Sequence, residues 1–385
     1  MQPLNKKVTV SCPTKFHSDY MLDQLEKHSL LKNAYTSHPR NSFLSRINLP
    51  VEKIKFLIPV FILPFITNKI KFLHSITALL NERLPILYDF LVSRLIGKSD
   101  ILIVWAWAGL NTIKTVKKHG GVVILEECGS CNKFQNQILA EEYKLLKLNF
   151  SNPTSKYIID REIDEAKLAD YILCPSNHVA QSFINNGFPP EKCKVIPYGV
   201  NLEFFKPQLI EKEQFRIIFV GSIGVRKGLI YLFEAIKILK NKYPIEATII
   251  GKVDAEFVSV FEAYKYLFKH IESVQHKELV DYYNSSSVFV LPSLDEGMAY
   301  VQLEAMACGL PIICTLNSGG DAIVNDGDEG FIIPIRSSQQ IAEKVEILFL
   351  NKDLLKTMST KAMKTAERFS WAEYGKKLAI FISEI

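Results

Sequence analysis

The chain has 385 residues, of which 48% are hydrophobic and 23% are charged, and its formal net charge is +5. The composition is ordinary for a globular protein. The length argues against a single hydrophobic core, so we expect two domains.

Charge is unevenly distributed along the chain. Residues 1–120 hold 17 Lys and Arg against 7 Asp and Glu, a net of +10, whereas residues 201–385 hold 21 against 24, a net of −3. A basic first half suggests an anionic partner, and a membrane surface or a phosphorylated acceptor fits as well as nucleic acid. Plain solvated lysines are the alternative explanation.

The amino terminus runs directly into a strand pattern and has no signal-peptide apolar core. No run reaches the roughly 18–20 apolar residues that span a bilayer. Seven cysteines without a secretory signal favour a reducing compartment, so we expect a cytoplasmic protein. Cys128 and Cys131 form a lone C-x-x-C, which is a weak signal for a metal or redox site.

In the first half, a strand at Lys7–Ser11 is followed by a polar link that contains His17. At Leu49–Thr77, an apolar stretch broken by Pro59 and Pro64 lies between basic residues, which is typical of an interfacial membrane anchor. A buried helix pair under a loop is the alternative. The flanking lysines are Lys53, Lys55, Lys69 and Lys71. Further strands are predicted at Ile101–Trp105, Val122–Glu126 and Tyr171–Cys174, with helices at Tyr20–Lys27, Thr112–Lys118 and Arg161–Ala169.

A turn-rich joint without a core pattern, Pro197–Asn201, separates the two halves. The second half repeats the alternation of strands and helices, which indicates two doubly wound parallel sheets. Its strands are predicted at Arg216–Gly221, Ala247–Gly251, Val288–Leu291, Pro311–Cys314 and Phe331–Ile333, with a helix at Leu229–Lys240.

Two carboxylates flank one strand–loop–helix junction in the second half. Glu296 follows the strand Val288–Leu291, at the sheet edge where α/β proteins place their ligands. Glu304 lies within a largely apolar helix predicted from about Met298 to Cys308, where a carboxylate needs hydrogen-bond donors. A helix N-terminal acid for Glu296 and an internal ion pair for Glu304 are the alternatives.

A glycine-bent loop after the strand Arg216–Gly221 carries Arg226 and Lys227 to a helix that opens after Gly228. Its glycine spacing matches neither a dinucleotide fingerprint nor a Walker loop. Two cations at a helix amino terminus suit a diphosphate. A third loop, Asn317–Asp321, lies at the same carboxyl edge and contains small residues that allow close approach of a ligand.

Together these junctions resemble the family-4 retaining glycosyltransferases of the two-domain GT-B fold. The resemblance rests on VGSIGVRKG, on EGMAYVQLEAMACGLPII with its E-x7-E spacing, and on NSGG followed by GDEGF. PYGVN at Pro197–Asn201 and ADYILCPS at Ala169–Ser176 also match the family. The match is strong over residues 170–335 and thinner before them.

The resemblance implies an α/β GT-B protein with domains at residues 1–197 and 198–370, facing an interdomain cleft, and a helix at 371–385 that returns to the first domain. It implies that Glu296 contacts the transferred sugar, Glu304 the ribose and Lys227 the diphosphate. The amides at Gly297–Tyr300 would bind sugar hydroxyls and phosphate oxygens. The catalytic candidates are Glu296, Lys227 and His17; the donor-binding candidates are Gly221, Ser222, Arg226, Lys227, Val274, Gly297, Met298, Ala299, Tyr300 and Glu304.

Two positions depart from the family pattern. Ser222 stands where the family commonly has arginine, and Arg226 is the candidate to supply that charge. The family histidine of the first domain is absent from the segment with Glu126, Glu127, Ser130 and Cys131, and His17 is a substitute by position.

We therefore expect a retaining transferase that uses a UDP- or GDP-sugar or a similar donor and needs no metal or other cofactor. The acceptor would be a glycan, a lipid-linked sugar or a small molecule, not nucleic acid. Peripheral contact with the inner face of the membrane through the basic first domain is an open alternative. A non-catalytic nucleotide-sugar-binding subunit and a GT-B epimerase or phosphorylase are the alternative functions.

Overall fold

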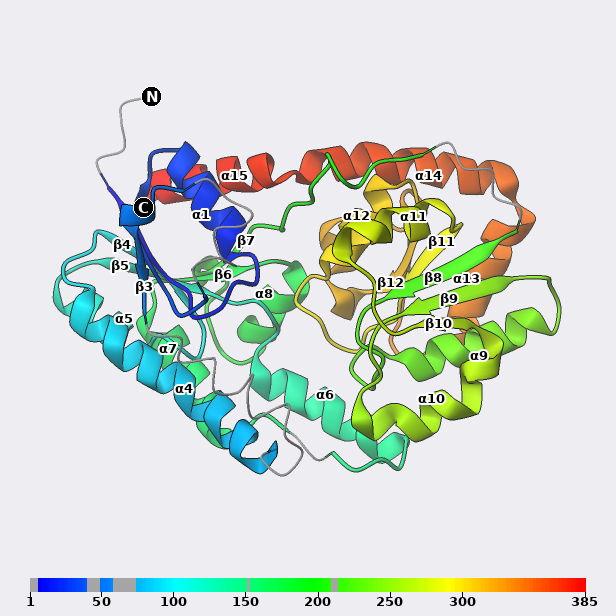
Figure 1. Cartoon of the computed structure of the whole chain (residues 1–385), viewed down its shortest axis with the longest axis horizontal. Coiled ribbons are helices and arrows are strands. Elements are labelled where there is room, and N and C mark those ends of the chain that lie inside the picture. Colours follow the sequence, from blue (N-terminus) through cyan, green and yellow to red (C-terminus); the bar gives the residue numbers. More distant parts are fainter. Residues whose placement is uncertain (1–5, 40–48, 58–73, 151–152, 209–213) are drawn as a thin grey trace.

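The structure, a computed structural model, describes residues 6–39, 49–57, 74–150, 153–208 and 214–385. Two α/β units lie side by side, each built around one parallel sheet (Figure 1). The segment between Val195 and Arg216 links the two sheets, and the predicted boundary at residues 197–198 falls inside it. Within the described residues, no helix is both long and apolar enough to cross a membrane.

The described part of the first sheet has seven strands in the order β3-β2-β1-β4-β5-β6-β7, all parallel. The strands are β1 (Val8–Ser11), β2 (Leu31–Thr36), β3 (Ile54–Phe56), β4 (Ile101–Trp105), β5 (Val122–Glu126), β6 (Tyr171–Cys174) and β7 (Cys193–Val195). The helices of this half are α1 (Ser18–Lys27), α4 (His74–Leu95), α5 (Leu110–Lys118), α6 (Asn132–Leu145), α7 (Lys156–Leu168) and α8 (Asn177–Ile184).

The described part of the second sheet has six parallel strands in the order β10-β9-β8-β11-β12-β13. The strands are β8 (Arg216–Val220), β9 (Glu246–Ile250), β10 (Lys269–Ile271), β11 (Val288–Leu291), β12 (Ile312–Thr315) and β13 (Gly330–Ile333). The helices are α9 (Leu229–Lys240), α10 (Val258–Tyr264), α11 (Leu279–Asn284), α12 (Tyr300–Ala307), α13 (Ser338–Leu350), α14 (Lys352–Ala366) and α15 (Trp371–Glu384).

The central strands form continuous apolar runs because helices cover both faces of a parallel sheet. All residues of β4 and β11 are buried. In each sheet the strand order reverses direction at the first strand, which has the next strand of the chain on one side and a strand from further along the chain on the other. β1 lies between β2 and β4, and β8 lies between β9 and β11. These switch points open crevices at the carboxyl ends of the strands, where α/β proteins bind ligands.

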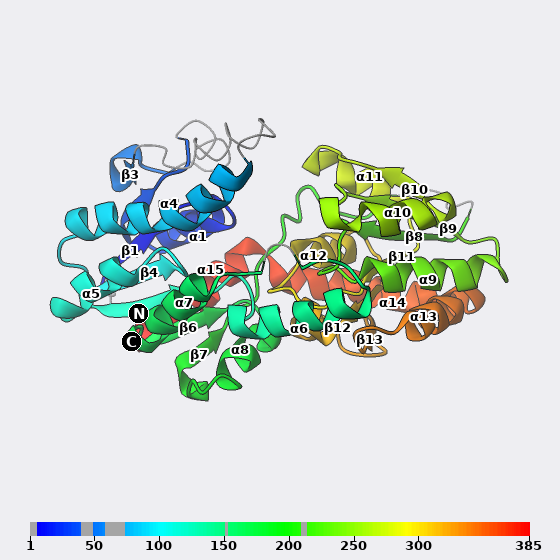
Figure 2. The ribbon, with the colours of Figure 1, turned by 90° about the horizontal axis from the view of Figure 1, so that it is seen from below.

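The last helix, α15, returns from the second unit to the first, as Figures 1 and 2 show. It lies against α1, where the rings of Trp371 and Tyr20 stack with centroids 4.3 Å apart. The joint before the second sheet is also tied to this region, since the Val200 amide donates to the Phe369 carbonyl at 2.7 Å. Although the joint has no core pattern in its sequence, Tyr198 and Val200 are both buried.

The predicted strands of the central sheets and the helix Leu229–Lys240 are confirmed, most of them to within one residue. The helix expected from Met298 to Cys308 is shorter and spans Tyr300–Ala307. Four strands, β2, β3, β7 and β10, were not predicted, and the long helix α4 is among the helices that were not predicted. The apolar centre of the expected membrane anchor lies outside the described residues, so both interpretations of it stay predictions.

Candidate donor-binding site

The junction of β8 and α9 forms a tight loop whose shape depends on glycine. Gly228 has φ +65°, and a Cβ on it would lie 2.1 Å from the Pro292 carbonyl oxygen. Only glycine meets both demands at low cost, so α9 can begin directly against the loop that follows β11. The side chains of Arg226 and Lys227 are thereby held at the amino terminus of α9.

Both cations contact one carboxylate, that of Glu296. Arg226 Nη1 donates to Glu296 Oε2 at 2.6 Å, and Lys227 Nζ forms an ion pair with the same oxygen. Burial acts to raise the pKa of Glu296, but the charges of Lys227 and Arg226 outweigh it and hold that pKa below its usual value. Burial lowers the pKa of Lys227, and Glu296 opposes this effect. The cluster therefore offers two fixed positive charges with one internal anion between them.

Glu304 lies inside the same crevice and is 5% exposed. Its Oε1 lies 2.7 Å from His276 Nε2, and its Oε2 accepts a hydrogen bond from the Tyr283 hydroxyl at 3.2 Å. His276 is the more exposed of the two partners. The chain thus supplies donors for this carboxylate without a ligand, which is the alternative the sequence left open. The ribose role stays a prediction.

The segment before α12 lies at the boundary between the two units. The Gly297 carbonyl accepts from the Ser176 hydroxyl of the first unit at 2.6 Å. A Cβ on Gly297 would lie 1.9 Å from the Cys128 carbonyl oxygen, so only glycine fits in this closed arrangement. Met298 and Ala299 are buried beside it. The other predicted donor-site residues lie at the ends of β8 and β10: Gly221 and Ser222 follow β8, and Val274 follows β10.

Asp295 connects the two units, and it was not identified as a functional residue from the sequence. This fully buried carboxylate accepts from Ser130 Oγ at 2.7 Å and Gln135 Nε2 at 2.7 Å, and it lies 2.9 Å from His178 Nε2. All three partners belong to the first unit, whereas Asp295 follows β11 in the second. The acidic doublet before Gly297 was the available signal, but the partners are remote in sequence.

His17 lies in the first unit, in the turn before α1. It is fully buried, and its Nε2 lies 3.0 Å from Glu126 Oε1 at the end of β5. His17 and Glu304 both line a cavity of about 230 Å³ between the units, together with Tyr300. The structure thus brings His17 to the segment in which the sequence lacked a histidine. Its catalytic role stays a prediction.

An apolar cavity of about 470 Å³ in the first unit lies next to the pair of His17 and Glu126. Phe16, Trp105, Trp107, Glu126 and Glu127 are in its wall. Trp107 is 44% exposed and has φ +68°, a strained conformation for a bulky residue. Its amide donates to Glu165 at 2.6 Å and its carbonyl accepts from Arg161 at 2.7 Å. These bonds hold an aromatic ring at the mouth of the cavity.

Residues 200–365, which contain the donor-site loops, match the family described as Glycosyl transferases group 1. This part of the chain is a group 1 glycosyltransferase domain. The capsular polysaccharide biosynthesis glycosyltransferase CapM of Staphylococcus aureus is 32% identical over 209 residues, which cover 52% of this chain and 54% of CapM. The chain spans about half the length of the curated relatives it matches.

Solved structures extend the likeness to the whole chain. HepE of Anabaena in complex with UDP and glucose has a TM-score of 0.68 at 13% identity and covers 99% of this chain and 100% of HepE. Sucrose-phosphate synthase of Thermosynechococcus elongatus has a TM-score of 0.67 at 14% identity and covers 99% of each chain. At such identities the likeness shows the fold, and the predicted GT-B architecture is confirmed.

Proposed function

We propose that the protein is a retaining glycosyltransferase that takes a sugar from a nucleotide-diphosphate donor. The observation that carries the proposal is the cluster at the start of α9, where Arg226 and Lys227 share the Glu296 carboxylate. A helix amino terminus with two cations stabilises the charge that develops on a diphosphate leaving group. The bound UDP and glucose in HepE support a nucleotide-sugar donor of this class.

The donor would bind across the carboxyl edge of the second sheet. When the diphosphate takes the cations, the Glu296 carboxylate becomes free to accept hydrogen bonds from the sugar hydroxyls. Glu304 would accept from the ribose hydroxyls while Tyr283 holds it in place. The cations replace the metal ion that other transferases need for the diphosphate, so we propose that departure of the nucleotide requires no metal.

The acceptor would meet the donor from the first unit. The cavity beside Trp107 provides an aromatic surface and the Glu127 carboxylate, a combination that suits a sugar ring with its apolar face and its hydroxyl edge. The name of CapM supports a glycan or lipid-linked acceptor in a cell-surface polysaccharide. We place the reaction in the cytoplasm, with the basic first half at the inner face of the membrane.

Transfer from radiolabelled UDP-, GDP- and ADP-sugars to an extract of acceptor glycolipids tests this function. The wild-type protein should give a labelled product whose anomeric configuration matches that of the donor. Lys227→Ala and Glu304→Ala should each lower the rate by at least about 100-fold, because each removes a charged contact to the donor. Unchanged rates in both variants would refute the site. Tight nucleotide binding without transfer to any acceptor would favour the non-catalytic alternative.

A further inference from the structure

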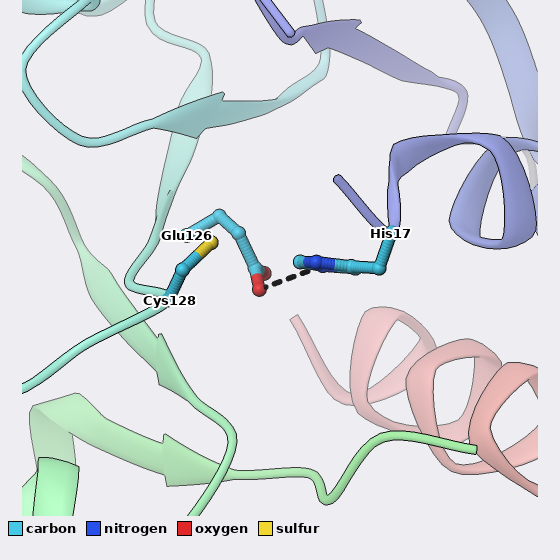
Figure 3. Close-up of side chains that lie close together, drawn as sticks. All are labelled: His17, Glu126 and Cys128. Carbon is cyan, nitrogen blue, oxygen red and sulfur yellow. Dashed lines mark ion pairs between the residues drawn. The ribbon is translucent and has the colours of Figure 1, made fainter. Parts of the chain in front are cut away.

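Three residues that bind metals in other proteins converge at the carboxyl edge of the first sheet. His17 precedes α1, Glu126 ends β5, and Cys128 follows it by two residues (Figure 3). One nitrogen, one oxygen and one sulfur atom from these side chains lie within 4.8 Å of one another. His17 and Glu126 are essentially inaccessible to solvent, at 0% and 1% exposure.

Several polar atoms of this cluster make no hydrogen bond to any of the described residues. His17 Nε2 lies 3.0 Å from Glu126 Oε1 as an ion pair, but among the described residues neither ring nitrogen of His17 has a well-aligned hydrogen-bond partner, and Glu126 Oε2 has none. A buried polar group without a hydrogen-bond partner is unfavourable, so several at one place favour the binding of an ion or of water there. Unpartnered atoms also occur on the surrounding aromatic residues, namely the hydroxyls of Tyr198, Tyr300 and Tyr374 and the Trp105 indole nitrogen.

We propose that His17, Glu126 and Cys128 bind one divalent cation of the zinc type. Imidazole, carboxylate and thiolate are the ligands that zinc takes in proteins, and three of them leave a fourth position for water. Ligand atoms in a tetrahedral zinc site lie roughly 3.3–3.8 Å apart, given bonds of about 2.0–2.3 Å. Small side-chain rotations would bring the three observed atoms to that spacing.

A metal fits this cluster better than a sugar hydroxyl does. A thiol is a weak hydrogen-bond partner, whereas a thiolate is a strong zinc ligand. The apolar cavity beside Trp107 reaches both Glu126 and Cys128 and gives a cation an access route. Cys131, the other member of the C-x-x-C, lies at the start of α6 and is not one of the three converging residues. In the structure, Cys128 thus lies near His17 and Glu126, and Cys131 does not belong to this group.

The cation would fasten the loop before α1 to the tip of β5. That tip supports the donor-site loop, because the Cys128 carbonyl is the group that excludes any side chain at Gly297. The metal would thus stabilise the surface on which the second domain closes. It takes no part in neutralising the diphosphate, and the inference does not depend on the proposed transfer reaction.

Metal analysis of the full-length protein, purified without a metal-binding tag, tests the site. After equilibration with Zn²⁺ and gel filtration, we expect about one zinc per chain by mass spectrometry, and a higher Tm than in chelator-treated protein. With Co²⁺ in place of zinc, we expect a near-ultraviolet thiolate charge-transfer band.

Cys128→Ser should abolish that band, and Glu126→Gln, which keeps the side-chain shape, should weaken Co²⁺ affinity at least tenfold. The matched control Cys131→Ser should retain the full band and affinity. Absence of stoichiometric zinc and of the band in folded wild-type protein would overturn the proposal. So would full binding in Glu126→Gln, or loss in Cys131→Ser without loss in Cys128→Ser.

Discussion

The Glu296 carboxylate accepts a hydrogen bond from Arg226 at 2.6 Å and is thereby held at the amino terminus of α9. Lys227 forms an ion pair with the same oxygen. In the absence of a ligand, this carboxylate occupies the place that the proposed donor diphosphate would take. Binding of the donor would exchange one anion for another and release Glu296 toward the sugar.

Glu296→Gln should therefore separate binding from catalysis. Removing the internal anion leaves Arg226 and Lys227 available, so a nucleoside diphosphate should bind about tenfold more tightly, a gain of ~1.4 kcal/mol. Transfer should fall at least about 100-fold, because the sugar loses its charged contact. Calorimetry and the transfer assay measure the two effects. Weaker binding together with unchanged transfer would contradict this role.

Asp295→Ala should open the two domains. The substitution leaves donors on Ser130, Gln135 and His178 without their acceptor, at a cost of about 2–4 kcal/mol. Small-angle scattering should show a larger radius of gyration, and the Tm should fall by several degrees. Asp328→Ala removes an exposed partner of Lys361 and should change neither quantity. An unchanged radius in Asp295→Ala would show that the closed form does not depend on this carboxylate.

Much of the fold could be predicted because central strands of a parallel sheet are continuous apolar runs. β11 and β5 were located to the residue, whereas β3 and β7 have three residues each and carry no such pattern. The donor-site loops could be found for a related reason, since glycines and cations cluster there within a few residues. The α12 boundary was missed by two residues because nothing in Met298 or Ala299 opposes a helix.

Contacts between distant segments could not be predicted. The approach of His17 to Glu126 depends on β4 lying between β1 and β5 in the sheet. The residues around His17 and Glu126 do not indicate this strand order. From the sequence alone, Asp295 is an acidic residue of a loop, and its role becomes visible only from its contacts with the first unit in the folded structure. His276 as a partner of Glu304 likewise depends on how the segment after β10 folds back over α12.

Stability should depend on pH through Glu165. Burial is the main cause that raises the pKa of this carboxyl from 4.5 to about 7, although Arg161 and two backbone amides oppose it. Between these values the folded state holds a proton that the unfolded state has lost, so the free energy of unfolding should decrease as pH rises from 4.5 to 7, by up to about 3 kcal/mol. Above pH 7 this contribution should stay constant.

Denaturant unfolding of wild-type protein and Glu165→Gln across this range measures the contribution. The glutamine variant cannot titrate at this position, so the difference between the two proteins should change with pH and then level off. A difference that is constant from pH 4.5 to 8 would contradict the assignment to Glu165.

Trp107→Gly should weaken binding of the acceptor and leave binding of the donor unchanged. Glycine adopts φ +68° without strain and keeps the backbone bonds to Glu165 and Arg161, so the change removes the half-exposed ring and its Nε1 hydrogen bond to Glu162 Oε1 at 3.3 Å. We expect the KM for the acceptor to rise about tenfold while the KM for the nucleotide sugar stays constant. Tyr266→Ala, which removes an exposed ring from the second domain, is the control. An unchanged acceptor KM would exclude this cavity as the acceptor site.

The most direct test of the central claim is calorimetric titration of a nucleoside diphosphate, chosen by thermal-shift screening of UDP, GDP and ADP. Wild-type protein, Lys227→Ala and Lys240→Ala are compared, since Lys240 is exposed at the opposite end of the same helix. We predict that Lys227→Ala binds at least about tenfold more weakly, a loss of ~1.4 kcal/mol or more, and that Lys240→Ala binds as wild type does. Equal affinity in all three proteins would contradict the placement of the diphosphate at the start of α9.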